Sequence, residues 1–190
     1  MKIFINPGHG GSDPGACGNG LREADVVLKI GRRVETYLRA VGYEVRLFQY
    51  GGVEGDLYTI CDSANSWQAD LFVSIHCNAS GGTGTETFYY EYSTAGKKLA
   101  NCIQRQIITS LKTRDRGLKT KINGGYDSYV TKYTYMPAVL VECAFIDNPT
   151  DANLLAERED DFARAIARGV TDYFMLEKPL PDVIDTPTRR

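Results

Sequence analysis

Two histidines and two glutamates are the residues of this chain best suited to hydrolytic chemistry. His9 and His76 are the only histidines in the sequence, and each lies at the end of a short apolar run typical of a strand. The carboxyl ends of parallel strands meet at one edge of a sheet, where ligands bind, so we expect the two imidazoles to share a metal ion. Catalytic zinc takes three protein ligands and leaves a position for water. The pattern therefore predicts a zinc hydrolase with one zinc ion.

Glu23 and Glu142 are the candidates for the two carboxylate roles of such a site. Glu142 ends a third apolar run, Ala138–Val141, and could accept a proton from water and pass it to a leaving amine. Glu23 begins a predicted helix just after the glycine-rich loop that holds His9. From the residues alone, a zinc ligand and a first-turn acid that complements the helix dipole explain Glu23 equally well.

The glycines around His9 could instead form a phosphate-binding loop. In Gly8 to Asp13, however, an aspartate stands where the pattern G-x-G-x-x-G needs its last glycine, and no Walker lysine-serine pair is present. This disfavours a phosphate site.

Cys77 and Cys143 adjoin His76 and Glu142, so either thiol could be a nucleophile paired with histidine. Neighbouring residues of a strand point to opposite faces of the sheet. If His76 and Glu142 face a crevice, both cysteines face the packed side, and buried free cysteine is common. We therefore expect these thiols to be structural.

Strand-like and helix-like segments alternate along the chain, which predicts an α/β fold. The expected architecture is a single domain with a twisted, mostly parallel sheet of about six strands and helices on both faces. Apolar runs or alternation predict strands over residues 2–5, 43–48, 70–76, 85–92 and 138–141. Helical spacing and caps predict helices over residues 23–41, 57–67 and 94–111, a helix start at Asn148-Pro149, and a last helix through residues 162–174.

Composition limits the classes of partner. A net charge of -2 argues against general binding of nucleic acid, and no apolar run is long enough to insert into a membrane. Five scattered cysteines, an odd number, predict reduced thiols. We expect a monomeric catalytic domain over residues 1–176. Residues 177–190 hold three of the seven prolines and show no periodicity, which predicts a linker or tail that could lead to a cell-wall-binding domain.

Four ordered motifs resemble those of the zinc-dependent N-acetylmuramoyl-L-alanine amidases, the cell-wall amidases of autolysins and phage endolysins. The resemblance covers roughly residues 1–174, and Asp115-Arg116-Gly117 and Pro137-Ala138 also look family-like. The four motifs are Pro7-Gly8-His9-Gly10-Gly11, Leu21-Arg22-Glu23, Ser74-Ile75-His76-Cys77-Asn78-Ala79 and Val139-Leu140-Val141-Glu142.

This resemblance implies zinc ligands at His9, Glu23 and His76, and a catalytic glutamate at Glu142. It implies hydrolysis of the amide between N-acetylmuramic acid and the L-alanine of the stem peptide, so peptidoglycan or its muropeptides are the expected partner. Two further residues are weaker candidates for substrate binding. Asn78 could orient substrate or simply form a turn. Arg116 belongs to a polar, tyrosine-rich segment that could line a glycan or peptide groove or form a solvated hairpin; its other members are Lys119, Lys121, Tyr126, Tyr129, Tyr133 and Tyr135.

Other functions and locations stay open at this level. A zinc peptidase or deacylase acting on wall peptides, or a non-catalytic peptidoglycan-binding module, would use the same scaffold. No signal peptide is evident after Lys2. We therefore expect synthesis in the cytoplasm and action on the wall after release, with a secreted enzyme whose leader has been removed as the alternative.

Overall fold

The chain folds around a six-stranded mixed sheet. In the computed structural model, residues 1–53, 56–122, 125 and 128–177 are described. The strand order is β4-β1-β5-β8-β6-β7, and the strands are β1 (Lys2–Pro7), β4 (Glu44–Leu47), β5 (Leu71–Asn78), β6 (Thr85–Tyr89), β7 (Asp115–Lys119) and β8 (Ala138–Phe145). β4, β1, β5 and β8 are mutually parallel, whereas β6 is antiparallel to β8 and β7 is parallel to β6. The predicted α/β class and mostly parallel sheet are confirmed.

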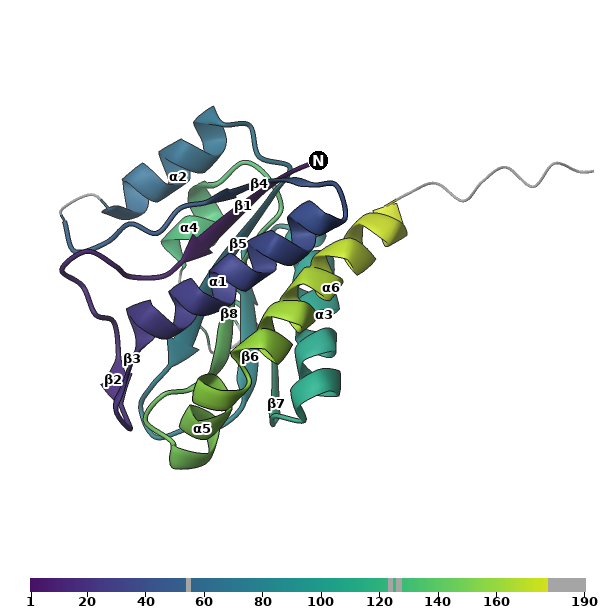
Figure 1. The fold of residues 1–190 in the computed structure, drawn as a ribbon. Coiled ribbons are helices and arrows are strands. Elements are labelled where there is room, and N and C mark those ends of the chain that lie inside the picture. Colours follow the sequence, from purple (N-terminus) through teal and green to yellow (C-terminus); the bar gives the residue numbers. More distant parts are fainter. Residues whose placement is uncertain (54–55, 123–124, 126–127, 178–190) are drawn as a thin grey trace, which may run out of the picture.

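Helices cover both faces of this sheet (Figure 1). One face carries the larger core and packs against α1 (Glu23–Ala40), α3 (Thr94–Leu111) and α6 (Glu159–Glu177), with α5 (Pro149–Glu157) beside them. The other face packs against α2 (Asp56–Ser66) and the short α4 (Tyr129–Tyr133) through a smaller core around Phe4, Phe72 and Leu140. On this second face, β5 and β8 continue beyond the smaller core, and the polar residues of the candidate site follow the apolar ones along both strands.

The predicted starts of two helices are confirmed in detail. The Ser93 side chain accepts a hydrogen bond from the backbone N–H of Gly96 and caps α3. The Asn148 side chain accepts hydrogen bonds from the N–H groups of Thr150 and Asp151 and caps α5, with Pro149 in the first turn. Side-chain oxygens satisfy donors that a helix start would otherwise leave without partners.

Two strands extend beyond their predicted ends. β5 continues to Asn78 and β8 to Phe145, so His76 and Glu142 lie within strands and not at their ends. The two strands stay paired with each other beyond the polar residues, because the hydrogen bonds of a sheet join backbone groups. A small antiparallel ribbon, β2 (Cys17–Gly18) with β3 (Leu21–Arg22), was not predicted and leads directly into α1.

The polar segment after residue 114 differs most from the prediction. A solvated hairpin is wrong for its start, because residues 115–119 form the edge strand β7 beside β6. The candidate Tyr126 and residues 178–190 of the predicted tail lie outside the described residues. Among the helices that are described, none has the length and apolarity needed to cross a lipid bilayer.

Candidate metal centre

Three side chains from three different elements meet at the carboxyl end of the central strands. His9 follows β1, Glu23 opens α1 and His76 belongs to β5, and one potential ligand atom from each lies within 4.8 Å of the others. Glu23 lies between the two imidazoles: its Oε2 atom is 3.1 Å from His9 Nε2, and its Oε1 atom is 3.1 Å from His76 Nδ1. Within the described part of the chain, this is the group of metal-ligating side chains that could hold an ion.

The backbone holds the Glu23 carboxylate from two directions. The N–H of Ala16 donates to Oε2, and the N–H of Cys77 donates to Oε1, each at 2.9 Å. Burial opposes ionisation of this carboxyl group, but hydrogen bonds from His76 and His9 outweigh it and hold the pKa of Glu23 well below its usual range. Glu23 is thus a buried, ionised carboxylate directed at two histidines, which is more than a helix-dipole role requires.

His9 has a carboxylate partner on its other ring nitrogen. The Nδ1 atom of His9 is 2.7 Å from Asp13 Oδ2, while Nε2 faces Glu23. Burial lowers the pKa of His9, but the hydrogen bonds and charges of Glu23 and Asp13 outweigh it and raise the pKa to about 9. Metal-binding histidines commonly donate their second ring N–H to a carboxylate, which fixes the tautomer and the ring orientation.

Two glycines leave the space that this cluster occupies. A Cβ atom on Gly8 would lie 2.2 Å from Cε1 of His76, and one on Gly15 would lie 2.6 Å from Cδ2 of His9. Gly15 also has a φ of +66°, which favours glycine. The glycine-rich loop is therefore explained by close packing against the imidazoles, and a phosphate site is not needed to account for it.

A row of polar side chains continues from His76 across the sheet. His76 pairs in register with Glu142 on β8, and Glu142 pairs with Glu86 on β6, so the three side chains project from the same face. Neighbouring strands lie about 4.8 Å apart, which puts the Glu142 carboxylate beside the metal cluster. Both glutamates are buried.

Glu86 accepts hydrogen bonds from both of the predicted substrate-binding residues. The Asn78 amide donates to Glu86 Oε1 at 2.6 Å, and the Arg116 guanidinium donates to Oε2 at 2.8 Å. The Lys119 ammonium lies 3.9 Å from the same oxygen. Two cations, Arg116 and Lys119, thus flank the buried carboxylate of Glu86.

The cysteines next to the cluster face away from it. Cys77 and Cys143 are buried in the core on the α1, α3 and α6 face. Burial raises the pKa of both thiols above its usual value. A buried, protonated thiol is a poor nucleophile, as expected for structural cysteines.

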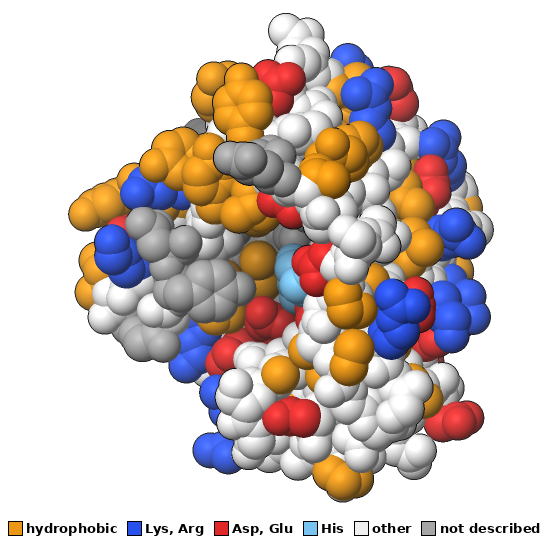
Figure 2. Space-filling view, turned by 90° about the vertical axis from the view of Figure 1, so that its left-hand side faces the viewer, with side chains coloured by type: hydrophobic (Ala, Val, Ile, Leu, Met, Phe, Trp, Pro, Cys, Tyr) orange, Lys and Arg blue, Asp and Glu red, His pale blue; other side chains and the backbone are white. Residues whose placement is uncertain are grey.

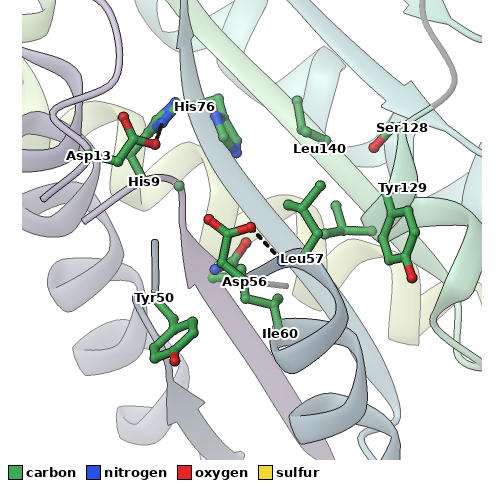
Figure 3. Close-up of a pocket in the computed structure, with 13 residues that line it drawn as sticks. His9, Asp13, Tyr50, Asp56, Leu57, Ile60, His76, Ser128, Tyr129 and Leu140 are labelled. Atoms are coloured by element: carbon green, nitrogen blue, oxygen red, sulfur yellow. Dashed lines mark hydrogen bonds and ion pairs between the residues drawn. The ribbon is translucent and has the colours of Figure 1, made fainter. Parts of the chain in front are cut away.

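A cavity of about 310 Å³ opens beside the two histidines. Figure 2 shows a histidine at the bottom of a hollow, with acidic side chains around it and hydrophobic side chains to one side. The cavity extends from His9 and His76 between α2 and α4, and Leu57, Ile60 and Tyr129 line its apolar part (Figure 3). A site with ionised groups at one end and apolar walls at the other suits a substrate that is held beside the reacting bond.

Sequence reasoning missed Asp13 and Glu86, which both contact residues that it selected. Asp13 precedes Pro14 and Gly15, a combination typical of a turn, and Glu86 is one polar residue in a stretch predicted as a strand. A signal existed for Glu86: it is the one acidic residue of the strand Thr85–Tyr89, and such a residue is seldom buried without a partner. The sequence around Asp13 has no comparable signal for a contact with His9.

Comparison with known proteins gives a consistent result. Residues 3–172 match a family model described as N-acetylmuramoyl-L-alanine amidase. The chain is 45% identical over 179 residues to the N-acetylmuramoyl-L-alanine amidase LytC of Bacillus subtilis, covering 90% of this chain but 35% of that protein. It is 38% identical over 183 residues to the sporulation-specific amidase of the same organism, covering 94% of this chain and 70% of the relative.

A solved structure has the same fold. The catalytic domain of CwlV, an N-acetylmuramoyl-L-alanine amidase from Bacillus (Paenibacillus) polymyxa, superposes with a TM-score of 0.82 at 31% identity, covering 92% of this chain and 98% of that one. The present chain therefore spans a catalytic domain of this kind and about a third of the length of LytC.

Proposed function

Because the chain belongs to the N-acetylmuramoyl-L-alanine amidase family, we propose that it hydrolyses the amide bond between N-acetylmuramic acid and L-alanine in peptidoglycan. The observation that carries the proposal is the cluster of His9, Glu23 and His76 beside a buried glutamate, Glu142. The catalytic unit is residues 1–176, and its place of action is the cell wall.

The donor set of the cluster fits zinc. Two imidazole nitrogens and one carboxylate oxygen are a common ligand set of catalytic zinc, and Asp13 supplies the expected partner of a histidine ligand. His9, Glu23 and His76 would hold the ion. When bound, zinc supplies a Lewis acid that polarises the scissile carbonyl and makes a water molecule more acidic.

Glu142 supplies the proton transfers. Its carboxylate accepts the proton of the attacking water and then donates it to the alanine nitrogen as the amide bond breaks. Its place next to His76 in the sheet supports this role, because a base must lie within reach of the water near the ligands. The same glutamate thus serves as base and acid in turn.

Asn78 and Arg116 bind the peptide side of the substrate. Both are tied to Glu86, beyond Glu142 and on the side where the leaving alanine must lie. The stem peptide carries carboxylates, and the cations of Arg116 and Lys119 complement them. Glu86 keeps both side chains in place.

The test is a comparison of the wild-type protein with Glu142→Gln. Wild-type protein loaded with zinc should release new L-alanine amino termini from purified walls, and no new reducing sugar ends. Glu142→Gln should bind one zinc ion per chain and lose at least about a hundredfold in rate, because a general base contributes about 10²–10⁴-fold. Loss of zinc from this variant would overturn the assignment of Glu142.

The products also separate the amidase from its alternatives. New amino termini from residues other than L-alanine would identify a peptidase acting on wall peptides. Binding to walls with no release of amino termini, with zinc fully bound, would identify a non-catalytic binding module. Either result would overturn the proposed reaction and leave the metal site standing.

A further inference from the structure

A second groove, rich in tyrosine, adjoins the catalytic cavity. It lies between α2 and α4, has a volume of about 460 Å³ and shares Tyr129 with the cavity beside the histidines. We call it the tyrosine groove. Its lining comprises four tyrosines and a set of small polar and charged groups: Tyr58, Tyr129, Tyr133 and Tyr135, with Cys61, Asp62, Asn65, Ser66 and Lys132.

The walls of the tyrosine groove are held together by Asn65. Its side-chain amide donates to the backbone carbonyl of Tyr133, and its side-chain oxygen accepts from the N–H of Tyr135, both at 3.0 Å. Tyr129 and Tyr133 lie one helical turn apart, with ring centroids separated by 4.4 Å. These contacts set the spacing between α2 and the chain around α4, so the aromatic faces are arranged before any ligand arrives.

The aromatic side chains are exposed more than an apolar core would allow. Tyr58 is 65% exposed and Tyr135 is 89% exposed, although both line the groove. Tyrosine gives a rigid contact surface at low cost in conformational entropy, so such clusters are typical of binding surfaces. The exposed tyrosines therefore indicate a ligand with flat apolar faces.

The charges of the tyrosine groove favour a neutral ligand. Asp62 and Lys132 are its charged lining residues, and their charges oppose each other. A glycan strand of N-acetylated sugars is neutral where its lactyl groups are bound in amide bonds. Its pyranose rings place C–H groups on aromatic faces, and its hydroxyl and acetamido groups suit partners such as Asn65 and Ser66.

The proposed reaction gives the direction in which the substrate lies. Glu142 must reach the leaving alanine nitrogen, and it lies on the side of His76 that leads toward Glu86 and Arg116. The peptide leaves toward that side. The cavity lined by Leu57, Tyr129 and Leu140 leads away from this row in another direction, back along the strands between α2 and α4, and the sugar end of the substrate extends through it (Figure 3).

We propose that the tyrosine groove binds the neutral glycan strand on the sugar side of the bond that is cut, beyond the sugar that carries it. This inference rests on the proposed function, since it names the part of the same substrate that the groove holds. The groove would make the domain prefer long glycan strands to isolated muropeptides.

The test measures the binding of glycan strands, several disaccharides long, whose lactyl carboxyl groups are capped as simple amides in place of the peptide, so that the strand stays neutral. The protein is first freed of metal by a chelator. Tyr58→Ala combined with Tyr135→Ala should weaken binding by about tenfold, since each aromatic contact contributes roughly a factor of two to ten. Both side chains are mostly exposed, so the double variant should keep the wild-type unfolding midpoint. Tyr92→Ala is the matched control: Tyr92 is 76% exposed and follows the end of β6 opposite to Glu86.

The outcomes are separable from those of the amidase assay. Absence of binding by the wild-type protein, or equal binding by the double variant and the wild type, would overturn the proposal. So would binding of free stem peptide that the double variant loses, because the groove would then hold peptide. Wall digestion by the wild-type protein, assayed in parallel with zinc, tests the reaction itself and does not depend on either result.

Discussion

Asp13 contacts the His9 ring on the side away from the proposed metal ion. Its carboxylate holds Nδ1 of His9 and leaves Nε2 directed at the cluster. We expect Asp13→Ala to weaken zinc binding by about 10–100-fold, the range typical for the loss of such a partner. Competition with a chromogenic chelator measures this affinity.

Asp25→Ala is a suitable control for Asp13→Ala, because Asp25 is an exposed carboxylate near the start of α1. An unchanged affinity in Asp13→Ala, or an equal loss in both variants, would contradict the orienting role of Asp13.

The protonation of His9 predicts a pH dependence of zinc binding. Its pKa is raised to about 9, so the metal-free protein carries a proton on His9 at pH 7. Zinc binds neutral imidazole, so binding must release that proton, and affinity should rise by up to about tenfold per pH unit between pH 7 and pH 9. Calorimetry at pH 7 in two buffers of different protonation enthalpy should count about one proton released.

The same shift affects the stability of the metal-free fold with a definite sign. A pKa raised from 6.5 to about 9 on folding stabilises the fold fully below pH 6.5, and this contribution is lost as the pH rises through 9. Zinc binding that releases no proton at pH 7 would contradict both statements.

At the residue scale, the sequence predicted the members of the cluster better than their partners. His9 and His76 stood out because the chain has no other histidine, and Glu142 because a charge ends an apolar run. Glu86 and Asp13 could not be assigned in this way, since their importance comes from contacts across strands and loops.

At the element scale, Asp151 fastens the loop before β6 to the end of β8. Its buried carboxylate accepts hydrogen bonds from the N–H groups of Gly84 and Phe145 and from the hydroxyl of Thr83. These hydrogen bonds hold the start of β6, and with it Glu86, beside β8. Asp151 and Gly84 lie 67 residues apart in the sequence.

Removing this carboxylate should loosen the edge of the sheet. We expect Asp151→Ala to lower the free energy of unfolding by about 3 kcal/mol, because buried donors lose a charged acceptor. Urea denaturation measures the change. Asp25→Ala, which also removes an acid from the first turn of a helix, should cost less than about 1 kcal/mol. A similar decrease in the free energy of unfolding in both variants would indicate that Asp151 acts only through the helix dipole.

Most elements were predictable because their apolar periodicity matches the face that they bury. β7 was not, because it is a short, polar edge strand, Asp115–Lys119, with Gly117 in a left-handed conformation and an irregular register against β6. Pairing at an edge depends on a neighbouring strand and leaves little trace in the local sequence. The turn of α4 is likewise too short to show helical spacing.

At the scale of the whole molecule, the metal cluster joins the loop after β1, the start of α1 and the C-terminal part of β5. An ion bound there stabilises the folded state only. At free zinc of 100 times the dissociation constant, we expect about 2.7 kcal/mol of added stability. For a chain of this size that raises the melting temperature by roughly 5–10 °C.

Thermal unfolding with zinc and with a chelator measures this difference. His76→Ala removes a ligand and should abolish most of it, whereas Tyr92→Ala should keep it. A melting temperature that does not respond to zinc in the wild-type protein would contradict the metal site, whatever the activity.

The two faces of the sheet have different roles, and this difference bears on which substitutions the domain can accept. The α1, α3 and α6 side carries the larger core, while the cavity, the tyrosine groove and the row from His76 to Glu86 lie on the side of α2 and α4. Substitutions on the exposed surfaces of α2 and α4 change the walls of the cavity and of the tyrosine groove and leave the larger core intact. We expect exposed positions of α2 and α4 to accept changes at a small cost in folding stability, because the larger core lies on the other face of the sheet.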